Sequence, residues 1–102
     1  MVGIDIVHLV RLNLDNAFIK LVLTDDEINI FNDIKTEERK REYLGGRFAA
    51  KEAIFKATQD RNYLAYIILN DEVNRPYVKD HEEIAISISH DGEYAIAIAI
   101  IK

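Results

Sequence analysis

The stretch from Gly45 to Ala57 constrains the fold most, because an acidic residue interrupts the apolar side of a helical pattern. At about 100° per residue, Leu44, Phe48, Glu52 and Phe55 fall on one side of a helix. An ionised carboxylate that is removed from water is strongly destabilising unless a cation or a metal ion pairs with it. The pattern therefore predicts a helix in which Glu52 points toward the core and needs a cationic partner.

Three basic residues flank Glu52 on this helix, namely Arg47, Lys51 and Lys56. Two interpretations are open. Glu52 forms a structural ion pair with Arg47 or Lys51, or is solvated by a rotated helix; alternatively, it holds a metal ion and phosphates together with these bases. The neighbouring pair Gly45-Gly46 costs about 1 kcal/mol per glycine relative to alanine in a helix, so it indicates close packing, a ligand or an interrupted helix.

Length and composition narrow the class of protein. The 102 residues predict a single domain, residues 1–102, with one core that oligomerisation would stabilise further. The absence of cysteine excludes disulfides, thiolate catalysis and cysteine-ligated zinc. The N-terminus lacks a signal-peptide pattern and no apolar run approaches the roughly 18 residues of a membrane span, so we expect a cytoplasmic protein without a membrane partner.

The charge is unevenly distributed. A net charge of -5 argues against a general nucleic-acid binder, yet residues 35–57 carry seven Lys or Arg against four Glu. A solvated helix surface and a docking site for an anionic partner both account for this basic segment.

The remaining pattern alternates helices and strands. Val2–Val10 favours a strand with Gly3 and Asp5 on one face. In the last two expected strands, isoleucines alternate with small residues. The face that carries the small residues allows a helix or another subunit to approach closely. Thr24 and Glu27 predict a capping box, and Thr36 caps a helix that we expect to end at Ala57 or Thr58. The other expected elements are a helix over Asn13–Leu21, a strand over Leu64–Leu69, a short Tyr77-Val78 segment, and a hairpin of Ile84–Ser89 with Tyr94–Ile101 through His90–Glu93.

Several common catalytic motifs are missing. The chain has no Gly-x-Ser-x-Gly elbow, no Walker loop and no Rossmann fingerprint. Its histidines, at positions 8, 81 and 90, lack the spacing of a zinc site, and His90 taken alone is typical of a turn.

Three segments are distinctive as an ordered set: Gly3–Val7 with Arg11, Gly46–Ala53 continuing to Lys56-Ala57, and Ser87–His90 with Tyr94-Ala95. In this order and spacing the chain resembles, over essentially its whole length, the holo-acyl-carrier-protein synthases, which are small bacterial 4'-phosphopantetheinyl transferases. The resemblance implies an α+β fold, an antiparallel sheet with a long central helix, assembled as a homotrimer that binds coenzyme A between subunits. It also implies transfer of 4'-phosphopantetheine from coenzyme A to a serine of apo acyl carrier protein in fatty acid biosynthesis, with release of adenosine 3',5'-bisphosphate.

The resemblance also implies roles for individual residues. Asp5 and Glu52 match the magnesium ligands, and together with Lys51 they are the expected catalytic groups. The expected contacts to the phosphates of coenzyme A are Arg47, Lys51, Lys56 and His90. Arg11 matches a contact to the acidic helix of the carrier protein, with Lys20, Arg39 and Arg41 as further candidates. Two carboxylates suit Mg²⁺, which prefers oxygen ligands and is commonly shared with substrate phosphates.

One departure and one alternative remain. The chain continues from Lys56-Ala57 through Thr58-Gln59-Asp60, where the family commonly has a glycine-containing loop, so the backbone near the nucleotide is expected to differ. The competing hypothesis is a non-catalytic oligomeric binding module, in which Asp5 and Glu52 are ion-pair partners of Arg47 and Lys51.

Overall fold

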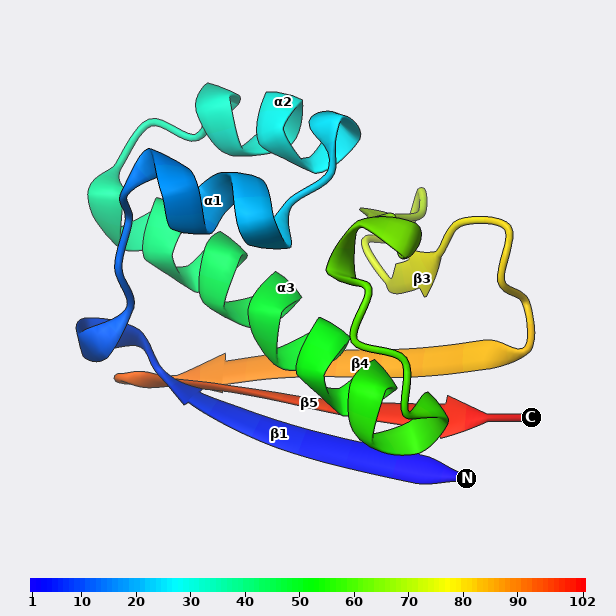
Figure 1. Cartoon of the computed structure of the whole chain (residues 1–102). Helices are drawn as coiled ribbons and strands as arrows, with labels where there is room; N and C mark the ends of the chain where they lie inside the picture. The colour runs from blue at the N-terminus through cyan, green and yellow to red at the C-terminus, as the bar shows by residue number, and fades with distance from the viewer.

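The structure, a computed structural model, describes residues 1–102 as three strands under one long helix, with smaller elements packed above that helix (Figure 1). The elements in chain order are β1 (Val2–His8), the 3-10 turn η1 (Leu9–Arg11), α1 (Asn16–Val22), α2 (Asp25–Asp33), α3 (Glu37–Thr58), the 3-10 turn η2 (Tyr63–Ala65), β2 (Ile68–Asn70), β3 (Pro76–Val78), β4 (Ile84–Asp91) and β5 (Tyr94–Ile101). No helix is long and apolar enough to cross a membrane.

The main sheet has the strand order β1-β5-β4, and both pairings are antiparallel. The β4–β5 hairpin turns at Gly92, whose φ of +58° lies in the left-handed region that glycine adopts readily. The two strands place residues of different size on the same face of the sheet. On the buried face, Ala97 of β5 pairs with Ile88 of β4. On the other face, Ile98 pairs with the exposed Ser87. The small face of β5 therefore accommodates a helix, which is one of the two alternatives that the sequence left open.

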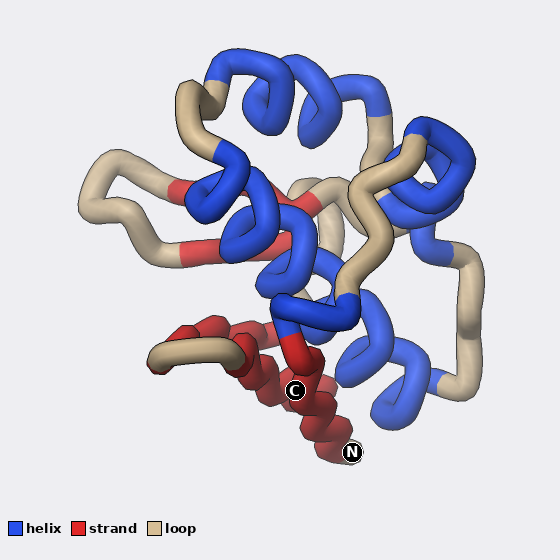
Figure 2. Tube along the Cα trace, turned by 90° about the vertical axis from the view of Figure 1, so that its left-hand side faces the viewer, coloured by secondary structure: helices blue, strands red, loops and turns tan.

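Helix α3 lies close against this sheet (Figure 2). A Cβ added at Gly3 would lie 2.0 Å from the carbonyl oxygen of Ala53, and one added at Gly46 would lie 3.1 Å from Ile88. The alanines of α3 at this contact are fully buried. The Gly45-Gly46 pair thus marks close packing within an unbroken helix, and the interrupted-helix alternative is wrong.

The opposite side of α3 is covered by α1, α2 and the β2–β3 hairpin (Figure 1). The predicted capping box at Thr24 and Glu27 is confirmed, as are the Thr36 cap and the end of α3 at Thr58. The expected strand over Leu64–Leu69 is wrong in its first half, because Tyr63–Ala65 forms η2 and the strand begins at Ile68.

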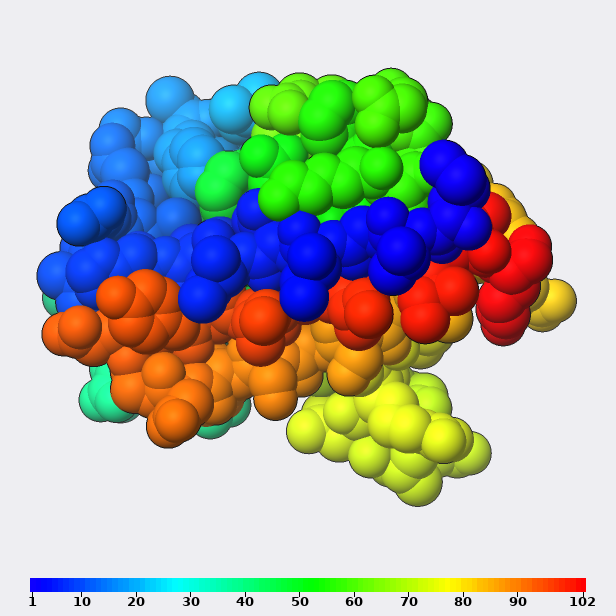
Figure 3. All heavy atoms as spheres, turned by 90° about the horizontal axis from the view of Figure 1, so that it is seen from below, coloured from blue at the N-terminus to red at the C-terminus, as the bar shows by residue number.

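The sheet face away from α3 is uncovered (Figure 3), and its exposed residues on β1 and β5 are mainly apolar. Its exposed isoleucines come from the edge strand β1 and the central strand β5: Ile4, Ile6, Ile96 and Ile100. Exposed apolar surface of this kind, gathered on one sheet face, is typical of an interaction site.

Candidate active site

Asp5 and Lys56 meet where β1 crosses α3. Gly3 permits the close approach of the strand to the helix, and Asp5, two residues later, is on the same face of β1. The Lys56 ammonium donates to Asp5 Oδ1 at 3.1 Å and to the carbonyl oxygen of Ile4 at 2.9 Å. The lysine side chain is 50% exposed and the aspartate 19% exposed, so the pair lies at the surface and can be reached by a ligand.

Glu52 lies one helical turn before Lys56 and is not a core residue. Its carboxylate is 18% exposed and accepts a hydrogen bond from the Tyr63 hydroxyl at 2.9 Å on Oε2. Oε1 lies 3.8 Å from the Arg61 guanidinium, which stacks over Phe55 at 4.0 Å. The prediction that Glu52 points into the core is wrong, because this side of α3 lies at the rim of the molecule.

We call these neighbouring groups the Asp5–Glu52 cluster: Asp5 with its partner Lys56, and Glu52, one turn before Lys56 on α3, with its partners Tyr63 and Arg61. No group of three or more acids and histidines exists that would hold a metal ion by protein ligands alone. Two carboxylates from adjacent elements are nevertheless the donor set for a Mg²⁺ ion that also binds substrate phosphates. The residues present fit such an ion, and Lys56 lies where it can contact the same phosphates.

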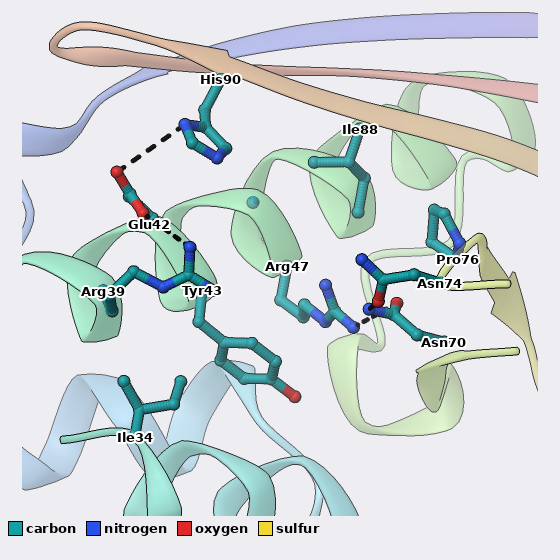
Figure 4. Close-up of a pocket in the computed structure, with 11 residues that line it drawn as sticks. Ile34, Arg39, Glu42, Tyr43, Arg47, Asn70, Asn74, Pro76, Ile88 and His90 are labelled. Atoms are coloured by element: carbon teal, nitrogen blue, oxygen red, sulfur yellow. Dashed lines mark hydrogen bonds and ion pairs between the residues drawn. The ribbon is translucent and has the colours of Figure 1, made fainter. Parts of the chain in front are cut away.

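A second polar region lies beside α3 at β4, where a pocket has a volume of about 290 Å³. Figure 4 shows the residues that line it. Arg47 crosses it and donates to Asn70 Oδ1 at 2.9 Å, with its guanidinium 4.4 Å from the centre of the Tyr43 ring. Burial raises the pKa of Tyr43 to about 12, and both its hydroxyl and Arg47 Nε are buried without a protein partner. These unpaired groups can bind a polar ligand.

His90 lies at the mouth of this pocket at the end of β4 (Figure 4). Its Nδ1 lies 3.7 Å from Glu42, and the other carboxylate oxygen of Glu42 lies 3.6 Å from Arg39. Glu42 therefore lies between His90 and Arg39, while Arg47 lines the same pocket. An anionic ligand that meets His90, Arg39 and Arg47 would compete with Glu42 for them.

Lys51 is placed differently from its expected role as a catalytic phosphate contact. Its side chain is 0% exposed, and its ammonium donates to Glu27 Oε1 at 2.6 Å and to the carbonyl oxygen of Val22 at 2.7 Å. Glu27 Oε2 accepts from the backbone of Ile68, so one buried pair connects α3, α2 and β2. Burial lowers the pKa of Lys51 although the carboxylate lies beside it. The structure gives Lys51 a structural ion pair in the core.

Arg11 is exposed at the end of η1, outside both regions. The Arg41 guanidinium donates to the carbonyl oxygens of Leu9 and Leu12 at 3.3 and 2.7 Å, so Arg41 holds this turn rather than extending a free basic patch. Lys20 and Arg39 are exposed.

The structure pairs Asp5 with Lys56, places Glu52 one turn before Lys56 on α3, and places Arg47 and His90 at one pocket, but it does not merge the two groups. Asp5 is on β1 and His90 is on β4, which are the two opposite edges of the sheet. None of the residues of the Asp5–Glu52 cluster lines the pocket. The binding-module hypothesis required Asp5 and Glu52 to form ion pairs with Arg47 and Lys51. The structure shows neither pair, because Arg47 contacts Asn70 and Lys51 contacts Glu27.

Sequence reasoning missed several residues that shape these two regions: Arg61 and Tyr63 beside Glu52, and Tyr43 and Asn70 beside Arg47. Tyr43 is one turn before Arg47 on α3, a spacing that could have indicated their contact. The others come from a loop, a 3-10 turn and a strand end, where no periodicity fixes the direction of the side chain.

Three comparisons with known proteins give consistent results. A family model described as the 4'-phosphopantetheinyl transferase superfamily matches residues 1–99. A holo-acyl-carrier-protein synthase from Mycoplasma capricolum is 44% identical over 101 residues, covering 97% of this chain and 91% of that protein.

Two crystal structures are also similar to this chain. One is a holo-acyl-carrier-protein synthase from Bacillus anthracis in complex with CoA (3',5'-ADP), with a TM-score of 0.86, 32% identity, and coverage of 98% of this chain and 93% of that one. The enzyme of the same name from Helicobacter pylori, in complex with coenzyme A, has a TM-score of 0.82 and 28% identity over 100% of both chains.

Proposed function

This chain belongs to the 4'-phosphopantetheinyl transferase superfamily and is an enzyme of the holo-acyl-carrier-protein synthase type, and from this premise we propose how its residues carry out the reaction. The substrate is coenzyme A, and the acceptor is a serine of an apo acyl carrier protein that serves fatty acid biosynthesis. The serine oxygen forms a bond to the phosphorus that carries pantetheine, the bond from this phosphorus to the bridging pyrophosphate oxygen breaks, and adenosine 3',5'-bisphosphate leaves with the electron pair. The serine proton passes to a base that we leave unassigned.

The observation that carries the proposal is the Asp5–Glu52 cluster, in which Lys56 pairs with Asp5 and Glu52 lies one helical turn before Lys56 on α3. We assign Asp5 and Glu52 as the magnesium ligands and Lys56 as a contact to the phosphates of coenzyme A. The bound ion would neutralise charge on the pyrophosphate and its leaving group. Lys56 is half-exposed on a flexible side chain, so it can exchange its bond to Asp5 for one to a phosphoryl oxygen.

Arg47 and His90 are the other proposed phosphate contacts, in the pocket at β4. The unpaired Nε of Arg47 and the Tyr43 hydroxyl support a polar ligand there. This pocket and the Asp5–Glu52 cluster lie at opposite sheet edges, and we propose that one coenzyme A molecule uses both by bridging two copies of the chain.

We therefore propose a homotrimer in which each site combines the Asp5–Glu52 cluster of one copy with the Arg47–His90 pocket of its neighbour. The uncovered isoleucine face of the sheet supports association, since water-exposed Ile4, Ile6 and Ile96 would be buried in it. A head-to-tail contact of this kind closes into a three-membered ring when neighbouring copies are related by a rotation of about 120°.

Mixing two defective variants tests the shared site. Glu52→Ala removes one half of the site and His90→Ala weakens the other, and each is expected to transfer poorly alone. If random trimers form on co-expression, roughly a quarter of the sites keep both halves, so the mixture should recover roughly that fraction of the wild-type rate. A mixture no more active than the average of the two pure variants argues against a shared site.

Arg11 is the proposed docking residue for the carrier protein. It is exposed at the end of η1, and Arg41 fixes the turn that carries it. A charge that steers an acidic partner acts on association and weakens with salt.

A further inference from the structure

We propose that Tyr63 is a positioning residue, which fixes the carboxylate of Glu52 by donating its hydroxyl proton to Oε2. The inference rests on the proposed function, in which Glu52 binds the metal ion. Tyr63 belongs to the segment that follows α3, which begins at Gln59.

The hydroxyl of Tyr63 is committed to this one acid. It lies 2.9 Å from Oε2, and a phenol that faces an ionised carboxylate can only donate to it. Charge-assisted hydrogen bonds of this kind are stronger than neutral ones.

The ring of Tyr63 is held in place by aromatic contacts. Its centroid lies 6.0 Å from that of Phe48 in an edge-to-face arrangement, and Phe48 in turn lies 5.2 Å from Phe18 of α1. Phe48 and Glu52 are one turn apart on α3, so the same helix supports the tyrosine ring and carries the acid that the tyrosine contacts.

The backbone that leads to Tyr63 is also ordered by its own side chains. Gln59 adopts the left-handed conformation that ends α3, with φ of +66°. Asp60 then accepts from the backbone of Asn62 at 3.0 Å and from the Tyr66 hydroxyl at 2.9 Å. The segment therefore has polar anchors on both sides of the residue that reaches Glu52.

The two oxygens of Glu52 differ as a result. Oε2 is occupied by Tyr63, whereas Oε1 has only the long contact to the exposed Arg61. Exposed ion pairs contribute little to stability, so a metal ion can readily replace Arg61. Oε1 is therefore the oxygen that is left for the metal ion. Fixing one oxygen of a ligating carboxylate orients the other, which is how residues outside the ligand set raise metal affinity.

The test compares Tyr63→Phe with a matched control, Tyr66→Phe. Each variant removes one phenol hydroxyl that donates to a carboxylate, but only Tyr63 contacts Glu52. Mn²⁺ is the probe, and its binding in the presence of coenzyme A and absence of carrier protein is measured by electron paramagnetic resonance. The Mg²⁺ concentration for half-maximal transfer is measured separately, and thermal melting without metal checks the fold.

We expect Tyr63→Phe to weaken Mn²⁺ binding about tenfold and to raise the half-maximal Mg²⁺ concentration in parallel, while Tyr66→Phe changes either value less than about twofold. Equal affinities for Tyr63→Phe and wild type overturn the inference and leave the proposed function intact. Equal losses in both variants also overturn it, because they assign the effect to the order of the segment. A wild-type chain that binds no Mn²⁺ overturns the metal assignment and the inference together.

Discussion

Lys51→Met tests whether Lys51 is a core residue or a phosphate contact. The substitution strands the Glu27 carboxylate, which is fully buried. Breaking a buried pair costs about 3–5 kcal/mol, and we expect the lower end because Glu27 keeps hydrogen bonds from Thr24 and Ile68. At about 4–8 °C per kcal/mol for a domain of this size, a loss of about 3 kcal/mol lowers the melting temperature by roughly 12–24 °C.

Lys56→Met is the matched control from the same helix. Its ion pair with Asp5 is half-exposed, so its loss should change stability by less than about 1 kcal/mol. Melting is followed by circular dichroism at one protein concentration, and transfer is measured per folded molecule well below the transition. We expect Lys51→Met to melt early but transfer when folded, and Lys56→Met to melt normally but fail to transfer. Adding Glu27→Gln to Lys51→Met should recover part of the lost stability. Normal melting of Lys51→Met with lost transfer would refute the assignment of Lys51 to the core.

Two other substitutions test the proposed docking residue, Arg11, and the close contact between β1 and α3 at Gly3. Arg11→Glu should raise the Michaelis constant for the carrier protein and flatten its dependence on salt, while that for coenzyme A stays within about twofold; weaker coenzyme A binding with normal use of the carrier would place Arg11 in the cofactor site instead. Gly3→Ala should destabilise the fold by about 1–3 kcal/mol in denaturant titrations, because the added Cβ would lie 2.0 Å from the carbonyl oxygen of Ala53. A Gly3→Ala variant as stable as wild type would show that β1 and α3 can separate without cost.

Local chemistry made the ends of the helices predictable. Thr24 with Glu27, and Thr36, are capping residues whose hydrogen bonds form within three residues of sequence, so the pattern alone indicates them. The hairpin at Gly92 is similar, since its turn needs a residue that tolerates positive φ. The matched motifs likewise named Asp5, Glu52 and Lys56, of which Asp5 and Lys56 form an ion pair and Glu52 lies one turn before Lys56 on α3.

The burial of α3 was not predictable, because this helix is covered on two sides. Alanines and Gly46 face the sheet, while Leu44 and Lys51 face α2 and the β2–β3 hairpin. A search for one apolar side therefore selected Phe48, Glu52 and Phe55, which lie at the rim, and took Lys51 for a surface base. Only the position of Glu27, on another helix, makes a buried lysine tolerable there.

The residues that contact Glu52 and Arg47 could not be predicted from the sequence, for a different reason. Tyr63 and Asn70 belong to a 3-10 turn and to the end of a three-residue strand, respectively. The direction of such side chains is set by tertiary packing, here by Phe48 and by the β2–β3 hairpin, rather than by a repeating pattern.

The most direct measurement of the central claim is the intact mass of an apo acyl carrier protein after incubation with this chain, coenzyme A and Mg²⁺. The account predicts that the carrier gains the mass of one phosphopantetheine on its serine and that adenosine 3',5'-bisphosphate appears in equal amount. It also predicts that Asp5→Ala and Glu52→Ala abolish the gain while melting within a few degrees of wild type, since both acids lie at the rim. An unmodified carrier with the folded wild-type chain, or full modification by either variant, would contradict the account.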